Sequence, residues 1–166
     1  MTWLHPALHD ETLRHTYEEV LDLAEWSAWA PVLEAAVGAP REPGVYLLRD
    51  ADVGVVRYVG MAGERAGSGR PQGLRGRLCV YRSGQGAVGG FGEAALDQAL
   101  ADPEWVEARL ATLRSRGPSR AKEWARDAVV RLAPEVSWAV CADREDARYL
   151  ESEVALLLRP LGVWNR

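Results

Sequence analysis

Two tyrosines, an arginine and a glutamate are the residues of this chain whose types and spacing could do chemistry together. Tyr46 and Tyr58 stand in two short β-type runs of the segment GVYLLRDADVGVVRYVG (44–60), each near a glycine. Arg77 follows in a short helical segment, and Glu151 in the last one. A phenolate can take up a proton, a guanidinium can neutralise a phosphate, and a carboxylate can bind a hard divalent cation. These side chains can act together only if the elements that carry them converge.

The two β-type runs of 44–60 predict a hairpin. Because strand side chains alternate between faces, Tyr46 and Tyr58 are expected on one face of it. If the turn centres on Asp52, the two tyrosines lie directly opposite each other, with the bases of their side chains about 5 Å apart. The alternative interpretation is a stacked aromatic pair that only supports the sheet.

The segment LRGRLCVYR (74–82) predicts a helix that presents arginines to solvent. At about 100° per residue, Arg77 and Arg75 lie on opposite flanks of its apolar stripe. An arginine beside a reacting phosphodiester supplies a delocalised cation and two donors in a fork. The alternative is a solvated arginine on an amphipathic helix. The stripe itself is formed by Leu74, Leu78 and Tyr81.

The last predicted helix carries a carboxylate among its apolar residues. At the helical period, Glu151 falls inside the apolar stripe, whereas Glu153 falls to its side. A carboxylate buried without a partner costs several kcal/mol, so Glu151 is expected to meet a metal, an arginine or a strong donor. The structural alternative is a buried ion pair with an arginine such as Arg77. The stripe is formed by Ala147, Leu150, Val154, Leu157 and Leu158.

The hairpin resembles the signature of the GIY-YIG nuclease family. GVY (44–46) stands for the first triplet and YVG (58–60) for the second, with valine in place of isoleucine in both. The segment LRGRLCVY (74–81) is similar to the family's arginine helix, with Arg77 at the arginine position.

The resemblance continues in LESEVALLLRPLGVWN (150–165), which is similar to the family's glutamate helix. Glu151 stands nine residues before Pro160, as the family's catalytic glutamate does, and Asn165 takes the asparagine position. The gap between the proline and the asparagine is longer here than the commonest spacing in the family, by about two residues. The resemblance covers about residues 41–82 and 135–166.

The resemblance implies a single-metal endonuclease that hydrolyses DNA phosphodiester bonds. Glu151 would bind Mg²⁺, with Mn²⁺ as a substitute, and Tyr46 would be the general base in a site that favours phenolate. Tyr58 would orient water or phosphate, Arg77 would neutralise the charge on the phosphate, and Asn165 would fix Tyr46 or the local backbone. Contacts with the substrate are expected from Gly60, Arg65, Arg70 and Arg75.

The resemblance also implies an α+β fold with a small three-stranded, mainly antiparallel sheet flanked by helices. Outside the hairpin, EVSWAVCA (135–142) alternates in the manner of a strand. Residues 1–40 form an acidic helical N-terminal extension, and 41–166 form the nuclease-like domain with a helical insertion at about 83–134. The predicted helix N-caps are Asp10, Asp102 and Asp143.

Charge is distributed unevenly along a chain whose net charge is −4. Residues 1–40 hold seven acids and one base, whereas 57–82 hold six arginines and one acid. Residues 109–131 hold seven bases and two acids. A polyanion is attracted to such local fields although the total is negative. The insertion is therefore read either as a DNA-grasping or dimerising surface or as a helical cover over the sheet. The extension either completes the fold or shields the site by mimicking DNA.

Other classes of protein are disfavoured by what the sequence lacks. No run approaches the apolar residues, about 20 of them, that a bilayer span needs, and no signal peptide is visible, so a cytoplasmic protein is expected. Cys79 and Cys141 have neither disulfide nor zinc spacing. DNA is the expected partner, RNA is not excluded, and a homodimer is considered. The alternatives are a catalytically inactive nucleic-acid-binding module on the same fold, and a structural domain whose Glu151 is paired internally.

Overall fold

A four-stranded antiparallel sheet organises the chain in the computed structural model, which describes residues 3–63, 72–83 and 89–165. The strand order is β1-β4-β2-β3, so β3 lies at one edge. No helix in these ranges is long and apolar enough to cross a membrane. The elements are α1 (Glu11–Asp22), β1 (Ala30–Pro31), α2 (Val32–Gly38), β2 (Gly44–Arg49), β3 (Val56–Ala62), α3 (Gly73–Ser83), α4 (Gly90–Leu100), α5 (Pro103–Arg116), α6 (Ala121–Leu132), β4 (Glu135–Val140), α7 (Arg144–Leu158) and the 3-10 turn η1 (Arg159–Leu161).

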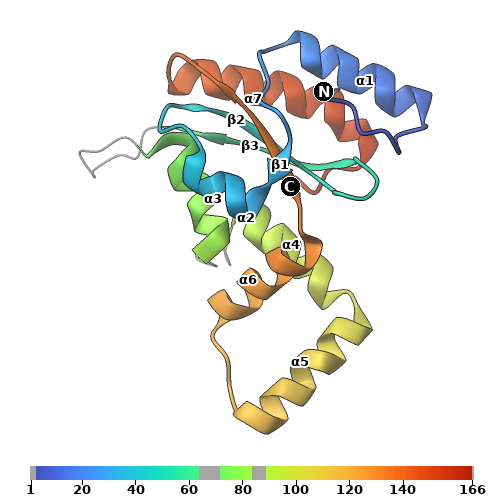
Figure 1. Cartoon of the computed structure of the whole chain (residues 1–166), viewed down its shortest axis with the longest axis vertical. Helices are drawn as coiled ribbons and strands as arrows, with labels where there is room; N and C mark the ends of the chain where they lie inside the picture. Colours follow the sequence, from blue (N-terminus) through green and yellow to red (C-terminus); the bar gives the residue numbers. More distant parts are fainter. Residues whose placement is uncertain (1–2, 64–71, 84–88, 166) are drawn as a thin grey trace.

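Helices cover both faces of the sheet. In Figure 1, α1 and α7 lie on one face, α2, α3, α4 and α6 lie on the other, and α5 projects away from the sheet. Strand β2 runs through the middle, and all six of its residues are buried. Its Val45 and Leu47 belong to the core under α1 and α7, whereas Tyr46 and Leu48 belong to the core on the opposite side. An apolar strand without polar alternation is what a sheet covered on both faces requires.

The expected α+β class is confirmed, but the sheet has four strands where three were expected. The additional strand is β1, which comes from the first 40 residues: Ala30 pairs with Val136, and Pro31 with Glu135, in β4. A two-residue strand that contains a proline shows no alternation and has a poor strand propensity, so pattern reading misses it.

The helix starts follow the sequence signals. All three predicted aspartate caps accept hydrogen bonds from backbone N–H groups of the first helical turn, and the proline after Asp102 lies in the first turn of α5. The donors are Leu13 for Asp10, Glu104 and Trp105 for Asp102, and Glu145 and Asp146 for Asp143.

The register of the hairpin differs from the prediction. Tyr46 pairs with Gly60, and Leu48 pairs with Tyr58, so the prediction that the two tyrosines lie directly opposite each other is wrong. They remain on one face as diagonal neighbours, with ring centroids 6.4 Å apart and an interplanar angle of 26°.

The turn explains the shift in register. Its hydrogen bonds run from the N–H of Asp50 to the carbonyl of Val55 and from the N–H of Gly54 to the carbonyl of Asp50. Gly54 takes a φ of +72°, which a residue with a side chain rarely adopts, and the pairing is irregular between Leu48 and Arg49. The turn is therefore not symmetric about Asp52.

We expect Tyr17→Phe to lower the free energy of unfolding by about 1–3 kcal/mol, because it leaves a buried N–H without a partner. Tyr17 on α1 is 2% exposed, and its hydroxyl oxygen accepts the N–H of Val56 at 2.8 Å. Urea denaturation measures the change. The control is Tyr149→Phe: that phenol is 70% exposed and makes no hydrogen bond within the described ranges, so a change within about 0.5 kcal/mol is expected. Equal effects of the two substitutions would contradict the prediction.

Candidate active site

Three phenols meet on the face of the sheet that carries α3 and α4. The hydroxyl oxygens of Tyr46 on β2 and Tyr81 on α3 are 2.5 Å apart and share a hydrogen bond. Tyr58 on β3 stacks on Tyr46. Phe91, at the start of α4, packs edge-on against Tyr58 and Tyr81, with centroid distances of 5.7 and 5.5 Å. Strands and helices from three parts of the chain therefore converge at one aromatic cluster.

Gly60 makes room for this cluster. A Cβ at position 60 would lie 2.6 Å from Cζ of Tyr46 and 3.0 Å from Cε1 of Tyr58, and closer still to the Tyr46 hydroxyl. Real Cβ atoms do not come so near ring carbons, so only glycine fits here. Gly60 was expected to contact substrate; on this face its backbone is covered by the two tyrosine rings.

Burial raises the pKa of all three phenols. Desolvation is the main cause at Tyr46, whose pKa lies well above its ordinary value, and neighbouring phenols raise it further. Desolvation also raises the pKa of Tyr58, followed by Tyr81 and Glu151 as negative neighbours. Desolvation raises the pKa of Tyr81, and its hydrogen bond with Tyr46 offsets part of this increase. Arg77 lowers the pKa of Tyr46, as expected, but does not outweigh the burial of a phenol that is 1% exposed, so a phenolate there stays a prediction that depends on Mg²⁺.

Glu151 lies half-buried on α7, at the edge of the sheet. Its carboxylate accepts a hydrogen bond from the backbone N–H of Met61 in β3. Desolvation raises the pKa of Glu151, while the Met61 N–H, Arg77 and Arg148 lower it. Within the described ranges no salt bridge is formed by Glu151, so the buried ion pair considered as an alternative is not observed there.

Arg77 is the positive charge that the site shares. Its side chain is exposed on α3, as the helical stripe predicted. It lowers the pKa of Glu151 and of the three phenols of the cluster, although in no case does it outweigh desolvation. The guanidinium therefore acts on the predicted carboxylate and on both predicted tyrosines, so four of the residues that the resemblance implied are electrostatically coupled.

Asn165 holds the backbone of β3 rather than the ring of Tyr46. Its side-chain oxygen accepts the N–H of Val59 at 3.0 Å, and its amide nitrogen donates to the carbonyl of Val59 at 2.6 Å. The neighbouring Trp164 N–H donates to the carbonyl of Arg57 at 2.6 Å. Of the two roles that the resemblance implied for Asn165, the structure shows the contact with the local backbone.

Of the three arginines expected to contact substrate, the structure describes one. Arg75 is half-buried on α3, and Arg65 and Arg70 lie outside the described residues. Tyr81 and Phe91 belong to the cluster but were not predicted as site residues. Tyr81 could have been found, because it places a polar hydroxyl group in the otherwise apolar stripe of its helix. No pattern singles out Phe91.

The described residues contain no group of three or more histidine, cysteine, aspartate or glutamate side chains that could hold a metal ion. Glu151, the metal ligand that the resemblance implied, therefore belongs to no such group. Magnesium tolerates a site with one protein carboxylate, because it retains several waters and takes other ligands from a substrate phosphate.

Comparison of the chain with protein-family models, with curated proteins and with solved structures gave no significant match.

We expect Gly60→Ala to displace Tyr46 and to destabilise the fold by more than about 1 kcal/mol, because the new methyl group overlaps the ring. Gly38→Ala is the control, since nothing lies within 4 Å of a Cβ at the end of α2. Thermal unfolding and near-UV circular dichroism report the two effects. A Gly60→Ala protein that keeps the wild-type midpoint and aromatic spectrum would show that the ring is not seated on position 60.

Stability should fall as the pH rises above about 10, the ordinary tyrosine value. A phenol whose folded pKa is raised holds its proton in the folded state when the unfolded chain has released it. Each such phenol then lowers the free energy of unfolding by up to about 1.4 kcal/mol per pH unit until its folded pKa is reached. Urea unfolding from pH 9 to 11 should give a shallower fall for Tyr46→Phe than for wild type. The control Tyr149→Phe should keep the wild-type slope, and a Tyr46→Phe slope equal to wild type would contradict the assignment.

Proposed function

We propose that the chain is a metal-dependent endonuclease that hydrolyses phosphodiester bonds of DNA through a single-metal site of the GIY-YIG type. The observation that carries the proposal is that Arg77 acts electrostatically on Tyr46, Tyr58 and Glu151, all of them residues that the family resemblance singled out, while the two tyrosines stack on each other. Structural ion-pair networks also perturb pKa values, but Glu151 has no salt bridge within the described ranges.

The Glu151 carboxylate fits the requirements of a Mg²⁺ ligand. It is a hard oxygen ligand, and desolvation makes its ionised form costly, as its raised pKa records. A divalent cation would offset that cost, whereas a structural salt bridge would already have done so. When bound, Mg²⁺ or Mn²⁺ supplies positive charge that polarises a phosphate and stabilises the departing 3′ oxygen.

The protein side chains divide the remaining work. Arg77, exposed beside the phenols, neutralises charge on the phosphate as the oxygen of the attacking water forms its bond and the bond to the 3′ oxygen breaks. Tyr58 is half-buried and reaches the surface, so we assign it the contact with the attacking water, whose proton it takes in the phenolate form. Tyr46 and Tyr81 support it from the interior. Asn165 holds the strand between Tyr58 and Gly60 in place.

A second candidate function is a nucleic-acid-binding module without catalysis. The burial of Tyr46 and the raised pKa values of the phenols favour it, because a neutral phenol is a poor base near pH 7. The two functions differ in what they predict for cleavage: only the nuclease converts supercoiled plasmid to nicked circles when Mg²⁺ is added.

Glu151→Gln should abolish Mg²⁺-dependent plasmid nicking, with a loss of at least about 100-fold, because the ligand charge is removed. It should also raise the unfolding midpoint. Because the pKa of Glu151 is raised in the folded state, its ionisation lowers the free energy of unfolding as the pH rises through the carboxyl range. The neutral amide of glutamine does not ionise, so the variant does not lose this stability at pH 7. Gel electrophoresis and thermal unfolding measure the two effects.

Glu153→Gln is the matched control, because it makes the same chemical change two residues along α7, outside the apolar stripe. It should nick plasmid as wild type does, and EDTA should stop both proteins. Nicking that survives Glu151→Gln, or wild-type protein that binds DNA with Mg²⁺ present and leaves it intact, would reject the nuclease.

A further inference from the structure

A basic surface lies at the far end of the helical insertion. We call residues 114–126 the α5–α6 tip: they comprise the end of α5, the connection and the first half of α6. Its single acid, Glu123, is engaged by the backbone N–H of Arg120 at 3.1 Å. The tip therefore carries five positive charges against one negative charge, on a chain whose net charge is −4. The five bases, all exposed, are Arg114, Arg116, Arg120, Lys122 and Arg126.

These five charges have no acidic partners within the described part of the chain. The salt bridges there engage the bases that flank the tip: Arg109 pairs with Asp127, and Arg131 pairs with Asp102. No bridge involves a base of the α5–α6 tip. Clustered like charges without counter-charges repel one another, and this cost is removed when a polyanion binds.

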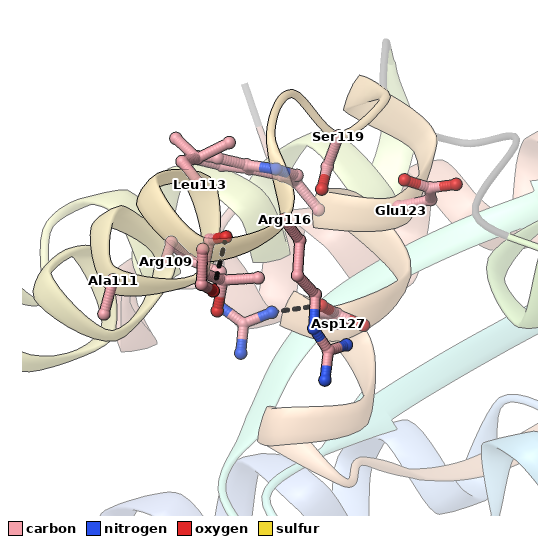
Figure 2. A pocket seen from close by; sticks show the side chains of 10 residues that line it. Arg109, Ala111, Leu113, Arg116, Ser119, Glu123 and Asp127 are labelled. Carbon is pink, nitrogen blue, oxygen red and sulfur yellow. Dashed lines mark hydrogen bonds and ion pairs between the residues drawn. The ribbon is translucent and has the colours of Figure 1, made fainter.

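A pocket of about 470 Å³ adjoins the tip, between α5 and α6. Its wall includes Arg109, whose guanidinium is held by Asp127 and lies 5.4 Å from the ring centre of Trp105. Arg116, at the end of α5, also lines the pocket (Figure 2), and within the described residues no salt bridge joins it to a carboxylate. The pocket wall thus holds two arginines and two acids, and it has room for a phosphate and its sugar, which Arg116 could contact.

Helix α4 connects the tip to the candidate active site. At its start, Phe91 packs against Tyr58 and Tyr81. Farther along, Ala95 and Ala99 share a buried core with residues of α6. Figure 1 shows α4 and α6 between the sheet and α5. A ligand held at the tip is thus kept at a set position relative to the phenols.

We propose that the α5–α6 tip is a second nucleic-acid site, which binds the phosphate backbone independently of base sequence, with Arg116 at the pocket as its central contact. This inference rests on the proposed function for the polymer it names. Nucleic acid is favoured because the charges are arginine-rich, exposed and spread over a helix end, whereas a small anion would be served by the pocket alone. The role of such a site is to hold the substrate beyond the bond that is cut.

Binding of a fluorescein-labelled DNA duplex, followed by anisotropy in EDTA over a series of NaCl concentrations, tests the proposal without requiring cleavage. Each of Arg116→Gln, Arg120→Gln and Lys122→Gln should reduce the slope of log affinity against log salt by about 1, and the triple variant by about 3. At low salt the triple variant should bind at least about tenfold more weakly. Two duplexes of unrelated sequence should give the same losses.

Arg159→Gln is the control, because it removes one exposed positive charge at the end of α7, outside the tip. It should leave the slope unchanged, and circular dichroism should show that every variant is folded. Tip variants that keep the wild-type slope would overturn the proposal, and so would tip variants that change only the oligomeric state in size-exclusion chromatography. If the duplex is bound and the tip variants lose binding but wild type does not nick plasmid, the tip stands and the nuclease assignment fails. If wild type nicks plasmid but the tip variants keep the wild-type salt slope, the nuclease assignment stands and the tip proposal fails.

Discussion

The absence of a side chain at position 60 is the constraint on which the candidate site depends. It lets the Tyr46 ring lie across β3, stack on Tyr58 and reach the hydroxyl of Tyr81 on α3. That contact fixes α3 against the sheet and thereby brings Arg77 to the same edge. Phe91 then seats α4 on the phenols, so the arrangement of the insertion also follows from one small residue. Interiors pack too closely for a methyl group to be absorbed at such a point.

Ionisation of the tyrosines and of Glu151 is unfavourable in this site, because these groups are partly or fully removed from water. Burial favours the neutral forms of the three phenols and of Glu151, and Arg77 is the cation that opposes this tendency at every one of them. Without a bound cation, burial therefore keeps the ionised forms of these groups unfavourable. Added positive charge would lower the pKa of every group. The binding of a cation is therefore linked to the fraction of phenolate, the form that accepts a proton.

Local signals predicted the elements better than their pairings. The aspartate caps and the apolar stripes of the helices are set by neighbouring residues, and these were read correctly, as was the common face of Tyr46 and Tyr58. The register failed because the asymmetric turn around Gly54 depends on backbone conformation rather than on residue pattern. The short β1 and the contact of Phe91 come from packing between distant segments, for which one sequence carries no signal. Function and metal dependence remain proposals.

The outer edge of β3 has one further consequence. Its free backbone groups are taken in succession by the Trp164 N–H, the Asn165 side chain and the Glu151 carboxylate. An uncovered edge strand is a template on which another chain can add a strand, and this is how many sheets begin to aggregate. The residues assigned to catalysis and to strand support therefore also close the sheet against its own copies. A change that frees this edge would expose backbone groups with which another copy of the chain could pair.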